Sequence, residues 1–271
     1  MRARHIDSAQ NFKKLSRIDN HMKIGISSAN IGAEGLWMQK LALEGYKLIE
    51  VNRRFTLMGF SGSNLKKIAK KAEDLGIGFT LHSAVTDLLH SDPLVHGSQL
   101  GILRSEIKYS PLIGCNDIVF HLSDHVSYTK DKAMVDDMLK DLSLFAQAHD
   151  VTLYLENDSH GPWSDVTQLK AIFLRHPDIK HVLDLGHLNV AVNHGLTRNH
   201  KHHLDQLKDF IDYLHVHGND GQWDQHLDLF GDESVQFLKR ALCLDPSFVI
   251  IETHAISDAH KTRSILEHLY Q

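Results

Sequence analysis

Cysteine is scarce in this chain, and the features of membrane and secreted proteins are missing. The 271 residues include two cysteines, Cys115 and Cys243, and neither belongs to a Cys-x-x-Cys pair. This argues against a disulfide framework and against a thiolate zinc site. No apolar run approaches the ~20 residues of a membrane-spanning helix, and the polar start MRARHIDSAQNFKKLSRIDN lacks the apolar stretch of a secretory signal. The sequence therefore predicts a cytoplasmic protein without a membrane segment.

Positive charge is not in excess either. Lys and Arg number 29 against 34 Asp and Glu, so the formal net charge is −5. This balance argues against binding of nucleic acid through bulk charge, although it is compatible with a local basic groove. Histidine, by contrast, is abundant, with 22 residues against 11 phenylalanines. Because histidine is a common metal ligand and proton carrier, the positions of these residues decide what they indicate.

From Met22 onward, short apolar runs alternate with longer segments of helical spacing. The runs predicted as strands cover 23–27, 47–51, 77–82, 117–121, 151–156, 179–184, 213–217 and 248–252. The segments predicted as helices cover 34–44, 63–76, 93–113, 131–149, 164–175, 199–210, 232–243 and 257–269. A loop is expected directly after the sixth strand.

Eight successive strand–helix units predict the α/β class and a (β/α)8 TIM barrel. Parallel strands need helix-length connections, and a barrel of this kind takes ~250 residues. A doubly wound open sheet is the alternative, but neither GxGxxG nor GxxxxGK[ST] of its nucleotide-binding versions occurs. We expect a single domain over 22–271, preceded by a polar arm over 1–21.

Imidazoles and carboxylates stand at or just beyond the ends of six successive strands. They are His82, His121, Glu156, Asp184, His187, His215, His217, Asp224, His226 and Glu252. The C-terminal ends of barrel strands converge on one mouth, where active sites lie. Glu156 and Glu252 follow strongly apolar runs, and a buried carboxylate needs a partner. Nitrogen and oxygen donors without thiolates therefore predict a metal-binding mouth, and they do not separate zinc from manganese or iron. Zinc is the first expectation, with manganese or iron as alternatives.

Two pairs among these residues have a spacing that supports a shared site. Asp184 and His187 flank Gly186, so a sharp glycine turn would let both side chains face one cavity. Asp224 and His226 are two residues apart, so an extended segment would put them on one side.

Further residues are expected near the mouth or on the surface. The candidates for contact with substrate are Arg53, Arg54, His125, His160, His217 and His254. Histidines in predicted loops or on helix faces are expected to be surface residues: His90, His96, His149, His176, His200, His202 and His203.

The segments LHS, FHLS, LEND, DLGH, LHVHGND, DQHLDLFG and IIET occur in the order of a known set of motifs. In this order they resemble the xylose isomerase-like TIM-barrel superfamily, and most closely its endonuclease IV branch (AP endonuclease family 2). The resemblance runs from Met22 to the C-terminus. It departs from the family's DNA enzymes in two places, because HSAVTD has no aromatic residue and NDSHGPW replaces a small, Gly-rich stretch.

The resemblance implies a site for three ions. The implied ligands of the first ion are His82, His121 and Glu156. Glu156 would bridge to a second ion, whose other implied ligands are Asp184, His215 and Glu252. The implied ligands of the third ion are His187, Asp224 and His226. His217 is the alternative to His215, because HVHGND has one residue more than the family's usual spacing.

The metal-ligand pattern and the resemblance together imply three alternative functions. The first is a hydrolase that uses two to three divalent ions on abasic DNA or on a small-molecule phosphodiester, with Glu156 and Glu252 as catalytic residues. The second is a sugar or sugar-phosphate isomerase or epimerase with one ion, in which Glu156 and Glu252 also transfer protons. The third is a metal-dependent binding protein without turnover.

The number of candidate ligands favours the hydrolase. A one-ion isomerase has no necessary role for His82, His121, Asp224 and His226. The net charge argues against DNA as the substrate of the hydrolase. The sequence does not indicate an oligomeric state.

Overall fold

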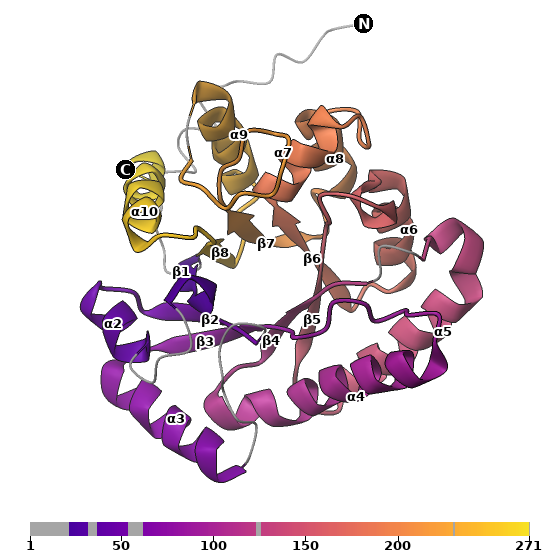
Figure 1. Cartoon of the computed structure of the whole chain (residues 1–271), viewed down its shortest axis with the longest axis horizontal. Helices are drawn as coiled ribbons and strands as arrows, with labels where there is room; N and C mark the ends of the chain where they lie inside the picture. The colour runs from indigo at the N-terminus through magenta and orange to yellow at the C-terminus, as the bar shows by residue number, and fades with distance from the viewer. Residues whose placement is uncertain (1–21, 32–36, 54–61, 123–125, 230, 271) are drawn as a thin grey trace, which may run out of the picture.

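Eight parallel strands close into a barrel, as the sequence predicts (Figure 1). The computed structural model describes residues 22–31, 37–53, 62–122, 126–229 and 231–270, so the predicted arm 1–21, Arg54 and His125 lie outside the described residues. The strands pair in chain order, and the last pairs with the first. They are β1 (Lys23–Ser27), β2 (Leu48–Asn52), β3 (Gly78–His82), β4 (Asp117–Phe120), β5 (Thr152–Glu156), β6 (Ile179–Asp184), β7 (Ile211–Val216) and β8 (Phe248–Ile251).

Helices surround the barrel and cover its outer face (Figure 1). The α-helices are α2 (Trp37–Leu43), α3 (Gly62–Leu75), α4 (Pro93–Tyr109), α5 (Tyr128–Gln147), α6 (Val166–Arg175), α7 (Leu185–Asn193), α8 (His200–Leu207), α9 (Asp232–Leu242) and α10 (Ile256–Tyr270). Short 3-10 helices are η1 (Ser28–Ile31), η2 (Ser110–Ile113) and η3 (Pro162–Ser164). Within the described ranges, no helix combines the length and the apolar character that crossing a membrane requires.

Local sequence signals explain where these helices begin and end. Helix α4 starts at Pro93 because the side chain of Asp92 caps it, accepting a hydrogen bond from the backbone N–H of Leu94 at 2.8 Å. Helix α3 ends at Leu75, and Gly76 follows it with a φ of 64°, which glycine adopts without steric cost.

Helix α7 is the main difference from the predicted order of elements. A loop is predicted after β6, whereas α7 begins at Leu185 without a gap. Asp184 caps it, because its Oδ1 accepts a hydrogen bond of 2.6 Å from the backbone N–H of His187. Gly186 therefore lies in the first helical turn, and the predicted glycine turn is wrong. A Cβ at this position would lie 1.9 Å from Cε1 of His217, so the glycine makes room for that imidazole.

The interior of the barrel is apolar below the strand ends. Alternate strand residues point inward, and those in the lower layers form a buried cluster: Leu48, Val119, Tyr154, Val182, Tyr213, Phe248 and Ile250. Burial of each such side chain contributes roughly 1.5–3 kcal/mol. The next inward positions along these strands are polar, and they form the floor of the site.

Candidate metal centre

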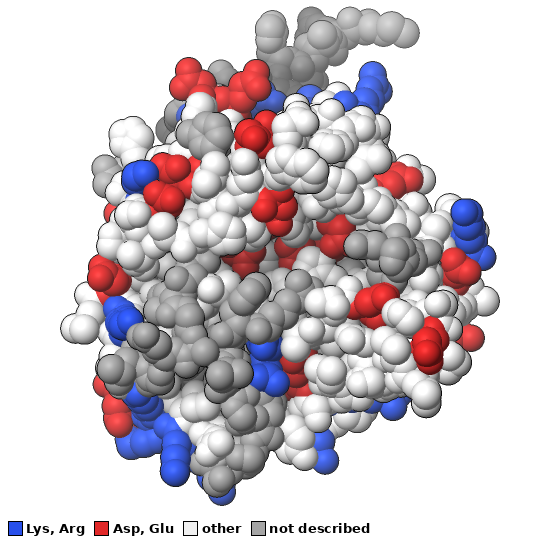
Figure 2. Space-filling view, in the orientation of Figure 1, with Lys and Arg blue, Asp and Glu red and all other residues white. Residues whose placement is uncertain are grey.

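A cavity of about 500 Å³ opens at the C-terminal end of the barrel. In the space-filling view of this face, Asp and Glu side chains are visible in the central hollow, while most Lys and Arg lie toward the edge (Figure 2). Most of the predicted ligands line the cavity, whereas Asp184 and His215 lie beneath it and are fully buried. The polar strand ends thus meet at one place, as the positions of these residues predict.

The predicted ligands form three groups, and the donor atoms of each group lie within 4.8 Å of one another. The first group is His82, His121 and Glu156. The second group is Glu156, Asp184, His215 and Glu252. The third group is His187, His217, Asp224 and His226. All nine residues implied as ligands belong to these groups, and His217 joins them as a fourth member of the third.

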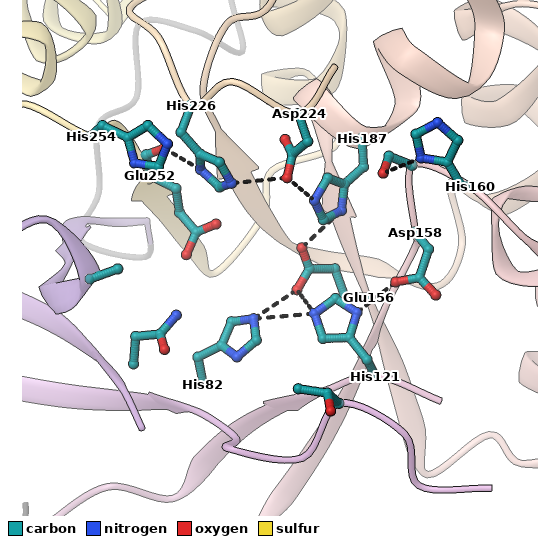
Figure 3. Close-up of a pocket in the computed structure, with 14 residues that line it drawn as sticks. His82, His121, Glu156, Asp158, His160, His187, Asp224, His226, Glu252 and His254 are labelled. Carbon is teal, nitrogen blue, oxygen red and sulfur yellow. Dashed lines mark hydrogen bonds and ion pairs between the residues drawn. The ribbon is translucent and has the colours of Figure 1, made fainter. Parts of the chain in front are cut away.

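The first group is built around one oxygen of Glu156 (Figure 3). Nε2 of His82 and Nε2 of His121 lie 3.2 and 3.1 Å from Oε2 of Glu156, and 3.3 Å from each other. Ligands at ~2.0–2.1 Å from a tetrahedral zinc ion are about 3.3 Å apart. Oε2 is buried and has no hydrogen-bond partner of good geometry. The spacing and the unpartnered oxygen therefore fit one divalent ion.

The second group uses the other oxygen of the same glutamate. Nδ1 of His215 lies 3.1 Å from Oε1 of Glu156, 3.5 Å from Oε2 of Glu252 and 3.8 Å from Oδ2 of Asp184. Glu156 thus presents Oε2 to the first group and Oε1 to the second. A carboxylate in this position is able to bridge two ions.

The third group converges on Asp224. Nε2 of His187 and Nε2 of His226 lie 3.1 and 3.0 Å from its Oδ2 (Figure 3). Its Oδ1 has no hydrogen-bond partner and lies 3.5 Å from Nε2 of His217, which is also 3.1 Å from Oδ1 of Asp184. His215 and His217 are therefore members of different groups, with His217 between the second and the third.

The backbone around Asp224 and His226 differs from the predicted one. His226 has a φ of 48°, which is a left-handed conformation. A turn, and not an extended segment, therefore brings the two side chains together. A short antiparallel bridge between Gly218 and Leu227 holds this turn.

Hydrogen bonds fix which nitrogen of each imidazole faces its group. In three histidines, Nδ1–H donates to a backbone carbonyl. His82 donates to Ser83 at 3.2 Å, His187 to Asn157 at 2.8 Å, and His226 to Glu252 at 2.7 Å. Nδ1 of His121 lies 2.7 Å from Oδ1 of Asp158. Partners on the far nitrogen are typical of metal-bound histidines, because they set the tautomer and the ring orientation.

The imidazoles are surrounded by negative charge. Burial alone would lower the pKa of His121, yet the carboxylates of Glu156 and Asp158 raise it to about 10. Burial likewise opposes protonation of His215, but Glu252, Glu50 and Glu156 hold its pKa well above its ordinary value. Protonated imidazoles thus neutralise the negative charge of the carboxylates. Bound divalent cations would neutralise that charge instead.

The two glutamates of the second group differ in acidity. Burial raises the pKa of Glu252. Burial also opposes ionisation of Glu156, but the nearby His215 and His121 hold its pKa well below the usual value. Within the second group, the surroundings therefore favour the ionised form of Glu156, at the end of β5, and the protonated form of Glu252, directly after β8.

The structure places only some of the residues predicted to contact substrate or to lie on the surface where the sequence predicts them. His160 and His254 line the cavity, while Arg53 does not line it and its Nε lies 3.4 Å from Oε1 of the buried Glu106. The prediction that His203 is a surface residue is wrong, because it is fully buried between α8 and β6, next to His181.

Three polar residues near the ligands were not predicted. Glu50 on β2 is fully buried, and its Oε2 lies 3.0 Å from Nε2 of His215. It stands inside the apolar run KLIEV, which is the same signal that pointed to Glu156 and Glu252. Asp158 and Asn157 belong to the motif LEND, and the side chain of Asn157 bonds both the N–H and the C=O of Asp184 at 2.9 and 3.1 Å.

Comparison with known proteins agrees with this fold. The sequence model of a family described as the xylose isomerase-like TIM barrel matches residues 38–270. An uncharacterized protein of Methanocaldococcus jannaschii is 24% identical over 218 residues, which is 76% of this chain and 81% of that protein.

Several solved structures have the same fold at low sequence identity. A D-psicose 3-epimerase in the presence of D-fructose is 18% identical with a TM-score of 0.71, covering 91% of this chain and 98% of that one. The 3-keto-D-glucoside 4-epimerase of E. coli is 16% identical with a TM-score of 0.71, covering 92% and 98%. The IOLI protein with a bound zinc atom is 17% identical with a TM-score of 0.73, also covering 92% and 98%.

Proposed function

Because the chain belongs to the xylose isomerase-like TIM-barrel family, we propose that it is a divalent-metal enzyme that hydrolyses phosphodiesters with more than one ion. The observation that carries this proposal is the position of Glu156. Its Oε2 faces His82 and His121, and its Oε1 faces His215. A carboxylate shared between two groups of donors serves a multi-ion site, and a one-ion isomerase has no need of the first group.

Bound divalent ions would supply polarisation of a phosphoryl oxygen and would lower the pKa of a water molecule toward ~7. The residues of the three groups would hold these ions, with Glu156 between the first and the second. His160 and His254, which line the cavity outside the three groups, would contact the substrate. No serine or cysteine nucleophile is needed for this chemistry.

The lining of the cavity favours a small substrate over DNA. Among the described residues that line it, none is Lys or Arg, and Arg53 is paired with Glu106. Proteins that bind nucleic acid neutralise several phosphates with such side chains. A small phosphodiester, such as a nucleotide-containing cofactor, is therefore the proposed substrate class, and abasic DNA is the alternative substrate.

A parallel assay tests this proposal. The metal-loaded protein is incubated with bis-(p-nitrophenyl) phosphate, with a duplex that contains an abasic site and with a panel of ketoses. We expect turnover of the small phosphodiester that is lost in Asp224→Ala. Cleavage of the duplex, lost in the same variant, would assign the endonuclease activity instead. Ketose interconversion without any phosphodiester cleavage would overturn the proposal.

The second candidate is a sugar or sugar-phosphate isomerase or epimerase. The similar solved structures named above favour it, because they include two sugar epimerases and no hydrolase. The second group also suits it, since the pKa of Glu156 is lowered and that of Glu252 is raised. Carboxylates with pKa values shifted apart are suited to remove and return a proton on either side of one carbon. The ketose panel tests this candidate directly.

A further inference from the structure

A fully buried glutamate lies directly beneath the second group and belongs to none of the three. Glu50 points from β2 into the barrel, and its Oε2 accepts a hydrogen bond of 2.6 Å from the hydroxyl of Tyr213. That hydroxyl is also 2.8 Å from Oγ1 of Thr80. The same oxygen of Glu50 lies 3.0 Å from Nε2 of His215. Glu50 is thus held from below and contacts the ligand above it.

His215 differs from the other imidazoles in the nitrogen that it presents. His82, His121, His187 and His226 are fixed through Nδ1 and present Nε2 to their groups. His215 presents Nδ1 to Glu156 and Glu252, so its far nitrogen is Nε2. Nε2 points down into the barrel, and its hydrogen-bond partner there is a side chain and not a backbone carbonyl. The side chain of Glu50 takes that role.

We propose that Glu50 is a positioning residue of the metal centre, which binds Nε2–H of His215 and so fixes Nδ1 as the nitrogen that ligates the second ion. Tyr213, whose hydroxyl also bonds Thr80, holds Glu50 in turn. A carboxylate on the far nitrogen of a metal-bound histidine orients the ring and raises the basicity of the ligating nitrogen. The proposal rests on the metal centre proposed above, but not on which reaction the centre catalyses.

The alternative is that Glu50 only satisfies a buried imidazole and does not affect the ion. The two readings differ in metal affinity. If Glu50 positions the ligand, its replacement weakens one ion site and leaves the others unchanged. If Glu50 is merely structural, its replacement lowers the stability of the metal-free protein and leaves the affinity of every site unchanged.

The test is a zinc titration of the full-length, metal-free protein by calorimetry. The variants are Glu50→Gln, which keeps the size of the side chain, and Tyr213→Phe, which removes only the hydroxyl that holds Glu50. The matched control is Asp117→Asn, because Asp117 is a carboxylate at the opposite end of the barrel that also accepts from a tyrosine hydroxyl, that of Tyr154. Thermal unfolding of each metal-free variant checks that it folds.

We expect Glu50→Gln to weaken one zinc site by ~10–100-fold, Tyr213→Phe to weaken the same site by less, and Asp117→Asn to leave all sites unchanged. In addition, ¹⁵N spectra of zinc-loaded wild-type protein should show His215 with the proton on Nε2, assigned by its loss in His215→Asn. Equal affinities in wild type and Glu50→Gln would overturn the role of Glu50 while the metal centre stands. A wild-type protein that binds no zinc would overturn the metal centre, and the role of Glu50 with it.

Discussion

Gly186 and His217 are so close that a single methyl group does not fit between them. A Cβ on Gly186 would lie 1.9 Å from Cε1, 2.4 Å from Nδ1 and 2.4 Å from Nε2 of the imidazole. The first turn of α7 therefore packs directly on the ring that lies between the second and third groups.

The first prediction is that Gly186→Ala displaces His217. Forcing an extra carbon into such a packed position costs roughly 1–3 kcal/mol, and we expect a lower melting temperature together with weaker zinc binding. The control is Gly97→Ala in α4, where no atom lies within 4 Å of the added Cβ; alanine should there be neutral or stabilising. Equal melting temperatures for Gly186→Ala and wild type would contradict the described packing.

The second prediction is that Glu156→Gln folds normally and loses activity. An amide bridges two cations poorly, and ion-assisted stabilisation of a transition state amounts to several kcal/mol, so turnover should fall by ~100-fold or more. The measurement is turnover on the substrate class that the parallel assay identifies, with circular dichroism as the check on folding. Near-normal turnover would remove Glu156 from the chemical centre.

The third prediction concerns the number of ions. Three groups of donors predict two to three equivalents of zinc, manganese or iron in protein purified without chelator, as measured by elemental analysis. A double variant, His82→Ala with His121→Ala, should lose one equivalent, because it removes both imidazoles of the first group. A ceiling of one equivalent in the wild type would favour the isomerase.

The fourth prediction concerns acid stability and lies outside the cavity. Burial lowers the pKa of His181 from 6.5 to about 4, and burial holds that of its neighbour His203 well below its ordinary value. The unfolded chain binds protons at these residues below about pH 6.5, whereas the folded chain does not, so stability falls as the pH falls toward 4. For His181 alone this loss amounts to roughly 3 kcal/mol.

Urea unfolding at pH 7 and pH 5 measures this effect. His181→Asn keeps a donor for the carbonyl of Leu155, which Nδ1 of His181 reaches at 3.1 Å, and it should lose less stability between the two pH values than wild type does. His268→Asn, at an exposed position of α10, is the control. An unchanged pH dependence in His181→Asn would show that the buried pair does not set the acid limit.

The fold could be predicted from the sequence because each strand and helix has a local sequence pattern. Each strand is a short apolar run, each helix has its own periodicity, and eight repeats of that unit leave few architectures. Helix α7 is not predicted because its start is set by the side chain of Asp184, which the pattern of strand ends assigns to a metal ion alone. The same carboxylate caps the helix through Oδ1 and faces His217 through Oδ2.

The sequence predicts which residues belong to the site, but not which of them contact one another. The imidazoles and carboxylates at the strand ends could be predicted to meet, because barrel topology brings those ends together. Glu50 is not predicted because it lies one layer deeper, where its partners Tyr213 and His215 come from a strand far away in the sequence. Likewise, no pattern could separate the roles of His215 and His217, because both point inward and only their depth in the barrel distinguishes them.

The order in which the donors occur along the chain sets the moment at which the centre can form. Residues of the second group come from strands β5 to β8, and the last of them, Glu252, follows a strand that is held in place by pairing with β1 near the beginning of the chain. This group is therefore incomplete until β8 has paired with β1 and the ring of strands has closed. Closure of the barrel and assembly of the second group of donors are thus a single event, so a chain whose ring of strands is open has no complete second group.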